Sequence, residues 1–200
     1  MPLQNRVNPE GEICFSPERG SLMGNRGCLH DDNQRVVAKT KRDAWVTCLL
    51  KFKERQRKLM QPGQYTELFF LDEATALAAG HRPCAECRRE RYKAFLAAWP
   101  ALGARAGDVD VVLKRERVSG HRPSVSMLGN LPDGVMVKEN VSGLFYLLNE
   151  GKARQWTFRG YLGAQDISTL SGSFVILTPA STVEGLKNGY RPEIHFSAHS

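Results

Sequence analysis

No part of this 200-residue sequence is a long run of apolar residues. A helix that crosses a bilayer needs roughly 18 consecutive apolar residues or more, so the sequence predicts no membrane segment. Residues 1–6 are polar, and no apolar core follows them as it would in a signal peptide. We therefore expect a cytoplasmic protein with reduced thiols and no membrane partner.

The sequence also lacks the cysteine pattern of a disulfide-stabilised scaffold. It has five cysteines, an odd number that cannot pair completely. Disulfides are rare in reducing compartments, where such cysteines more often bind metals or take part in catalysis. Apolar residues make up 42% and charged residues 24%, an ordinary globular composition that argues against wholesale disorder. The pattern favours metal binding as the use of the thiols.

Negatively charged residues are outnumbered by positively charged ones. Lys and Arg number 28 against 21 Asp and Glu, which gives a formal net charge of +7. An excess of positive charge favours an anionic partner, of which nucleic acid is the commonest. The cations cluster in segments 39–58, 88–93 and 114–117. One such cluster is most often a solvated surface, but two of these flank the motif described next.

The most informative segment is 71–87, which has the pattern of a short helix followed by a Cys-x-x-Cys knuckle. Asp72 can cap the first turn of the helix, and the alanines that follow favour helix. Gly80 suits the left-handed residue that ends a helix, and Pro83 prevents the helix from restarting. Cys84 and Cys87, displayed just after this stop, can both bind one zinc ion at roughly 2.3 Å. The spacing therefore predicts a zinc site.

A zinc ion needs two ligands besides this pair. Cys28 and His30 lie in a glycine-rich loop that can bend around a metal, and we predict them as the other two ligands. Cys48 lies in a predicted strand, where a cysteine is most often a small core residue, but it remains the main rival. The predicted zinc site is therefore Cys28, His30, Cys84 and Cys87.

The remaining patterns predict an α+β protein. In residues 1–100 we expect a small zinc-stabilised lobe that begins with a glycine-rich loop. It continues with a β-hairpin (45–52 and 65–71), the short helix, the knuckle and an amphipathic helix over 88–99. In residues 108–200 we expect a helix over 109–118 and then a mainly antiparallel β lobe, with strands over 135–138, 144–148, 154–158 and 173–177. The two lobes could also form one continuous domain.

Residues 69–87 resemble the second half of the zinc-binding module of the Ada DNA-repair methyltransferase family. That module has an apolar strand, a short alanine-rich helix and Gly-aromatic-Arg-Pro-Cys-x-x-Cys in this order, as here in Gly80-His81-Arg82-Pro83-Cys84-Ala85-Glu86-Cys87. The resemblance covers about residues 65–90 and implies that Cys84 and Cys87 are structural zinc ligands. The family's earlier Cys-x-x-x-Cys pair is absent, and Cys28-Leu29-His30 is its nearest substitute. The methyltransferase motif Pro-Cys-His-Arg does not occur, so the resemblance implies no methyl transfer.

These observations leave three classes of function open. The first is a zinc-stabilised nucleic-acid-binding protein, for DNA rather than RNA, in which Trp45 or Tyr65 stacks on an exposed base. The phosphate contacts would come from the cations next to the knuckle: Arg82, Arg88, Arg89, Arg91 and Lys93. The second is a metal-dependent hydrolase or nuclease built on loop 25–32, where His30 stands beside Asp31 and Asp32. The third is an interaction module without chemistry of its own.

Overall fold

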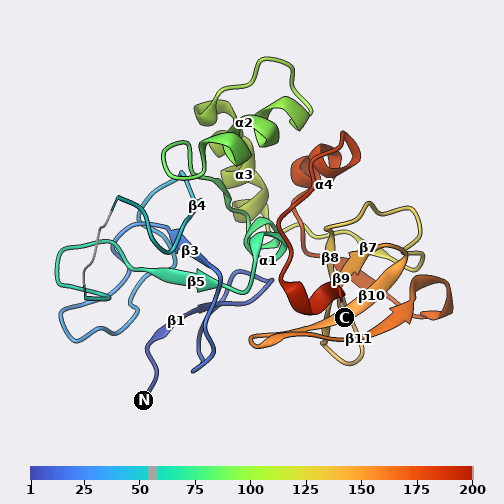
Figure 1. Ribbon diagram of the computed structural model, residues 1–200, viewed down its shortest axis with the longest axis horizontal. Coiled ribbons are helices and arrows are strands. Elements are labelled where there is room, and N and C mark those ends of the chain that lie inside the picture. The colour runs from blue at the N-terminus through green and yellow to red at the C-terminus, as the bar shows by residue number, and fades with distance from the viewer. Residues whose placement is uncertain (54–57, 200) are drawn as a thin grey trace.

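Two six-stranded sheets and four α-helices make up the part of the chain that is described (Figure 1). The computed structural model describes residues 1–53 and 58–199. The expected α+β class is confirmed: one sheet is mixed, and the other is antiparallel. None of the described helices is long and apolar enough to cross a membrane.

The first sheet is formed by residues 4–83 in the order β2-β1-β5-β3-β4-β6. Its strands are β1 (Gln4–Val7), β2 (Ile13–Phe15), β3 (Leu22–Asn25), β4 (Val46–Cys48), β5 (Leu68–Phe70) and β6 (Arg82–Pro83). Two of its pairings, β1 with β5 and β4 with β6, are parallel, and the others are antiparallel.

The predicted hairpin between segments 45–52 and 65–71 is wrong, because β3 lies between β4 and β5. The sequence predicted a loop for β3 because the segment is rich in glycine. Gly24 instead allows a close approach within the sheet: a Cβ at this position would lie 2.3 Å from Cε2 of Phe70. A glycine in a strand often marks such a contact.

The second sheet is antiparallel throughout and has the order β11-β10-β9-β8-β12-β7. Its strands are β7 (Ser124–Val125), β8 (Met136–Glu139), β9 (Phe145–Asn149), β10 (Lys152–Thr157), β11 (Gly160–Asp166) and β12 (Phe174–Ile176). The four strands predicted in this half are present. Asn149 pairs with Lys152 across a two-residue turn, in which Glu150 and Gly151 both have positive φ, as a tight hairpin requires.

The helices are α1 (Glu73–Ala78), α2 (Arg89–Ala98), α3 (Ala106–Ser119) and α4 (Ala180–Lys187). Helix α1 lies at the centre of the molecule, between the two sheets, and all six of its residues are buried (Figure 1). Asp72 caps it as predicted: Oδ1 accepts a hydrogen bond from Thr75 N at 2.9 Å. Gly80 ends it with a φ of +79°.

One hydrophobic cluster draws side chains from both segments, 1–100 and 108–200. It contains Leu77 of α1 and Phe95 of α2 together with Leu113 of α3, Val137 of β8 and Leu186 of α4. The boundary between residues 100 and 108 therefore does not separate two independent cores.

Two buried carboxylates at the start of α1 connect the parts of the fold. Asp72 Oδ2 accepts hydrogen bonds from Tyr161 Oη (2.7 Å) and from His195 N (3.0 Å). Glu73 forms ion pairs with Arg88 (3.0 Å) and Arg91 (2.8 Å) at the beginning of α2. It also accepts hydrogen bonds from the C-terminal segment, namely from Tyr190 Oη at 2.7 Å and Glu193 N at 2.8 Å.

We expect Glu73→Gln to destabilise the protein by about 3 kcal/mol or more, because the substitution leaves the buried Arg88 guanidinium without its buried counter-charge. Glu90→Gln is the matched control, since Glu90 pairs with Lys93 on the exposed surface of α2. That change should alter the free energy of unfolding by less than about 1 kcal/mol. Urea denaturation measures both, and equal small effects would contradict the role assigned to Glu73.

Candidate metal centre

Two parallel strands bring Cys48 and Cys84 together. Val46 of β4 is level with Arg82 of β6, and Thr47 is level with Pro83, so Cys48 and Cys84 come next along the two strands. The backbone fixes this register, because Cys84 N donates a hydrogen bond to Thr47 O at 2.9 Å. Both cysteines therefore leave the sheet at the same end.

The Cys-x-x-Cys turn adds the third sulfur. The Sγ atoms of Cys48, Cys84 and Cys87 all lie within 4.8 Å of one another, and each cysteine is half-buried. In a tetrahedral zinc site with Zn–S bonds of about 2.3 Å, the sulfurs are roughly 3.8 Å apart, so three sulfurs this close need only small adjustments to bind one ion. The backbone of the turn also helps, because Glu86 N donates to Cys84 Sγ at 3.4 Å. These three cysteines could bind a metal ion.

The three thiols perturb one another. Hydrogen bonds from the thiols of Cys48 and Cys87 hold the pKa of Cys84 well below its usual range, and the backbone N–H groups of the turn act in the same direction. The pKa of Cys48 is raised, first by its hydrogen bond to Cys84 and then by that to Cys87. One thiolate is therefore stabilised by the others, whereas ionisation of all three requires a cation in the centre.

Within residues 1–53 and 58–199, no fourth Cys, His, Asp or Glu joins this group. Closed structural zinc sites have four protein ligands, whereas sites with three protein ligands leave one position for water or another ligand. The described side chains could therefore supply three ligands to one metal ion.

The structure does not bring Cys28 and His30 to the cysteine cluster, and Cys48 takes the place predicted for them. Strand β3 runs antiparallel to β4, with Met23 opposite Cys48 and Asn25 opposite Val46. The chain after Asn25 therefore leaves the sheet at the end opposite to Cys48.

The surroundings of these two residues agree with that placement. His30 is buried, and its Nδ1 lies 2.6 Å from Thr66 Oγ1. The other ring nitrogen, Nε2, lies 3.2 Å from Gln61 O. Cys28 Sγ donates to His30 O at 3.7 Å. A fifth cysteine, Cys14, lies on β2, at the opposite edge of the sheet from β6.

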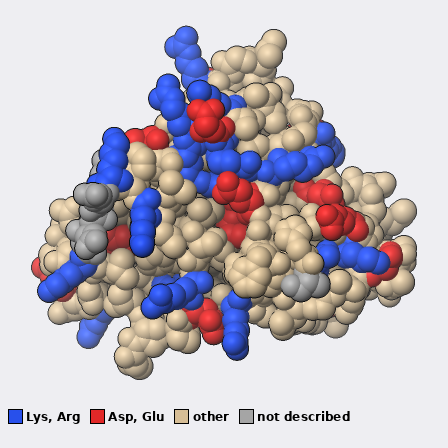
Figure 2. Space-filling model, in the orientation of Figure 1, with Lys and Arg blue, Asp and Glu red and all other residues tan. Residues whose placement is uncertain are grey.

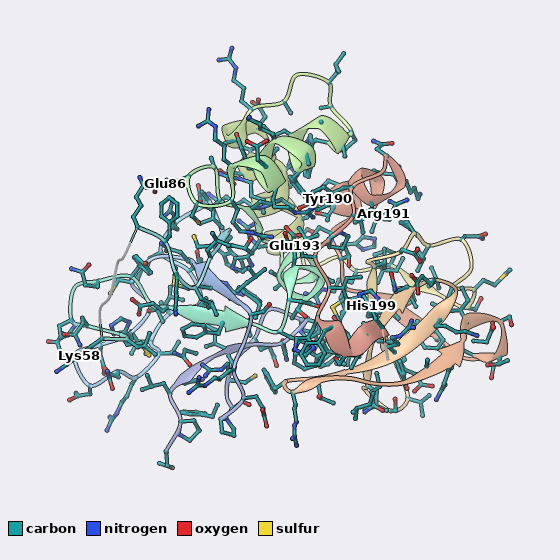
Figure 3. The ribbon with its side chains drawn as sticks, in the orientation of Figure 1. Lys58, Glu86, Tyr190, Arg191, Glu193 and His199 are labelled. Atoms are coloured by element: carbon teal, nitrogen blue, oxygen red, sulfur yellow. The ribbon has the colours of Figure 1, made fainter. Side chains whose placement is uncertain are left out.

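Three of the five cations predicted to contact phosphates form ion pairs inside the molecule. Arg82 is buried and donates to both carboxylate oxygens of Asp110, at 2.8 and 2.7 Å. Arg88 is buried between Glu73 and Glu193, and Arg91 is half-buried against Glu73. Figure 3 shows Glu193 and Tyr190 close to α1. The guanidinium groups of Arg82 and Arg88, predicted to contact phosphates, therefore face carboxylates of the fold. The exposed pair is Arg89 and Lys93.

The other sequence candidates have structural roles as well. In loop 25–32, Asp31 Oδ1 accepts hydrogen bonds from the backbone N–H groups of Asn33 and Arg35, both at 2.9 Å, as in a capped turn. The described part of this loop contributes to no metal-ligand cluster. Trp45 is buried, and guanidinium groups of Arg26 and Arg117 lie over its ring.

No protein-family model, curated protein or solved structure matches this chain. What the centre can do therefore follows from its geometry and donor atoms.

We expect Cys48→Ser and Cys84→Ser each to lose most of the bound metal, from about one ion per chain in the wild-type protein, because each removes one of three sulfur ligands. Elemental analysis of the purified protein measures this content. Cys14→Ser and Cys28→Ser are controls that should keep it. If His30→Ala or Cys28→Ser lost the metal while Cys48→Ser kept it, the assigned ligand set would be wrong.

Proposed function

We propose that the protein is a zinc-binding protein that also binds nucleic acid, DNA in preference to RNA. The observation that supports metal binding most strongly is the convergence of three cysteines from two strands and a turn: Cys48, Cys84 and Cys87. Three sulfur donors favour zinc over magnesium or calcium, which prefer oxygen ligands. Zinc is also compatible with the tetrahedral arrangement of a Cys-x-x-Cys knuckle.

In this proposal the metal cross-links a weak part of the fold. Strand β4 has three residues and β6 has two, so few backbone hydrogen bonds hold this edge of the first sheet. A metal that binds Cys48 on one strand and Cys84 after the other fastens them, and its binding free energy adds to the stability of the folded state.

The nucleic-acid part of the proposal is supported by exposed cations close to the centre. Lys51 follows Cys48 by three residues, Arg89 follows Cys87 by two, and Lys93 lies one turn further along α2; all three are exposed. Figure 2 shows Lys and Arg side chains over the upper part of the molecule as drawn, where α2 and α3 lie in Figure 1. Arg55 and Arg57 of the predicted basic segment 39–58 lie outside the described residues.

We expect DNA affinity to fall steeply with salt, by about tenfold or more between 50 and 200 mM, because phosphate contacts by cations release counterions. A double variant, Lys51→Glu with Arg89→Glu, should weaken binding by about tenfold or more at low salt and reduce the salt dependence. Fluorescence anisotropy with a labelled DNA duplex measures both quantities, and an RNA duplex of the same sequence tests the preference for DNA.

Arg159→Glu is the control, because Arg159 is exposed on the β10–β11 hairpin and the net charge changes in the same direction. Metal content must be equal in all variants. A second double variant, Arg159→Glu with Lys152→Glu, changes the net charge by the same amount as Lys51→Glu with Arg89→Glu. If both double variants weakened DNA binding equally, only net charge would matter. That result would contradict a binding face at the metal centre.

A further inference from the structure

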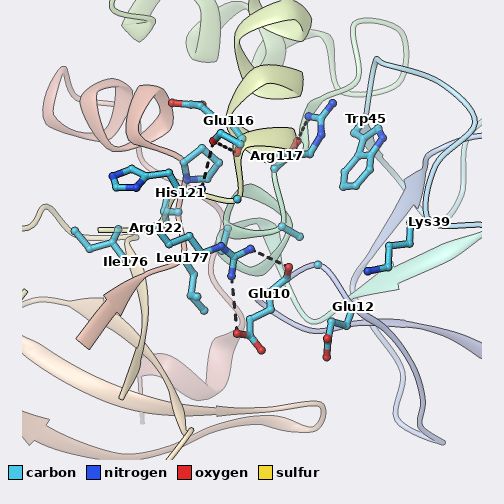
Figure 4. Close-up of a pocket in the computed structure, with 18 of the residues that line it drawn as sticks. Glu10, Glu12, Lys39, Trp45, Glu116, Arg117, His121, Arg122, Ile176 and Leu177 are labelled. Carbon is cyan, nitrogen blue, oxygen red and sulfur yellow. Dashed lines mark hydrogen bonds and ion pairs between the residues drawn. The ribbon is translucent and has the colours of Figure 1, made fainter. Parts of the chain in front are cut away.

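A large cleft lies between the first sheet, the end of α3 and the beginning of α4 (Figure 4). Its volume is about 1290 Å³, and its walls are formed by residues of segments 10–14, 36–39, 116–123 and 176–187. A cavity of this size can enclose a ligand as large as a nucleotide. It is separate from the metal centre, since none of the three clustered cysteines lines it.

Arg26 lines this cleft and carries a buried charge that no carboxylate neutralises. The residue is 1% exposed, and among the described residues no Asp or Glu lies within ion-pair distance of it. Its Nη1 donates to Gly11 O (2.8 Å) and its Nε to His81 Nε2 (3.2 Å), but Nη2 has no hydrogen-bond partner among the described residues. Buried charges in proteins are ordinarily paired. The N–H groups of Nη2 are therefore donors that an anion could use.

A second guanidinium adds to the positive charge at this end of the cleft. Arg117 donates to two backbone carbonyls, Gly80 O at 2.9 Å and Asp43 O at 2.7 Å. The Cζ atoms of Arg26 and Arg117 lie 3.9 and 4.2 Å from the centre of the Trp45 ring. Burial, and then the charge of Arg117, lower the pKa of Arg26 to about 9. Trp45 therefore holds two cations close together; among the described residues no carboxylate forms an ion pair with either, and the charges of Asp110, Asp43 and Glu116 only partly offset the lowering of the pKa of Arg117 by burial.

His81 keeps Arg26 in this position without neutralising it. Burial, followed by the charges of Arg26 and Arg117, holds the pKa of His81 well below its usual range. The imidazole is therefore neutral, and its Nε2 accepts the hydrogen bond of Arg26 Nε. Gly11 lies beside Nη2, because a Cβ at this position would be 3.7 Å from that nitrogen.

The carboxylates of the cleft, and two of its other cations, have partners. Glu10 pairs with Lys138 at 2.9 Å and with Arg122 at 4.0 Å. Glu116 accepts hydrogen bonds from Ser181 N and Oγ at 2.9 and 2.6 Å. The remaining contacts are between Lys187 and Glu184 (2.8 Å) and between Glu12 and Asn8 Nδ2 (3.3 Å). Lys39 adds a further cation and lies on the same side of the cleft as Trp45 and Arg117 in Figure 4.

We propose that the end of the cleft formed by Arg26, Trp45 and Arg117 is a phosphate-binding subsite, in which a phosphate oxygen accepts the hydrogen bond of Arg26 Nη2. The phosphate group belongs either to a free nucleotide or to the backbone of a nucleic-acid strand that enters the cleft. This subsite does not depend on the metal centre or on the exposed cations of the proposed nucleic-acid face.

The test measures binding of three probes to the full-length protein at constant ionic strength: inorganic phosphate, adenosine 5′-monophosphate and a single-stranded oligonucleotide. Isothermal titration calorimetry gives the affinities, and the shift of the melting temperature on addition of each probe checks them. We expect Arg26→Met to weaken binding of at least one probe by about tenfold or more, since it removes a charge-assisted hydrogen bond. Arg122→Met is the control, because this arginine lines the same cleft but pairs with Glu10; it should change affinity by less than about twofold.

Arg26→Met should fold at least as well as the wild type, because it removes a buried, unpaired charge. If it does not fold, Arg26→Lys keeps the charge but loses the donor geometry of the guanidinium, and the same loss of affinity is expected.

Arg26-dependent binding of the mononucleotide identifies a nucleotide pocket, and Arg26-dependent binding of the oligonucleotide alone identifies a strand site. No binding of any probe, or equal binding by wild type and Arg26→Met, would overturn the proposal. Lys51→Glu leaves the cleft unchanged, so failure of the nucleic-acid face and failure of this subsite are distinguishable.

Discussion

The two buried carboxylates at the head of helix α1 hold the structure together. Asp72 binds Tyr161 of the second sheet and the backbone of His195, and Glu73 binds Arg88 and Arg91 of α2. Carboxylates buried to this extent are tolerated only when hydrogen bonds and opposite charges replace the lost water. The second sheet, the start of α2 and the C-terminal segment are therefore connected through one short helix.

The metal centre depends on this arrangement through Arg88. This arginine directly follows Cys87, pairs with Glu73 and Glu193, and donates to Thr47 Oγ1 at 2.8 Å. Thr47 precedes Cys48, so one side chain links the knuckle to the strand that supplies the third sulfur. Arginines next to a zinc knuckle are easily interpreted as a phosphate-binding surface. Here Arg88 instead connects the two segments that carry the cysteines, whereas its neighbour Arg89 is exposed.

Local signals in the sequence predicted the elements well and the long-range pairings poorly. The Asp72 cap and the Gly80 stop depend on neighbouring residues, and the structure confirms both. The insertion of β3 between β4 and β5, and the parallel register of β4 with β6, depend on contacts between segments far apart in the chain. That register decides that Cys48, rather than Cys28 and His30, lies beside Cys84. The sequence did not predict the burial of Arg88 either, because its partner Glu193 lies 105 residues away in the chain.

Zinc K-edge X-ray absorption of the purified protein tests the three-sulfur centre most directly, because it counts the sulfur ligands around the metal and measures their distances. The structure predicts three sulfur atoms at about 2.3 Å and one lighter ligand at about 2.0 Å. Two sulfur atoms with nitrogen ligands, or no bound zinc in protein prepared under reducing conditions, would contradict it.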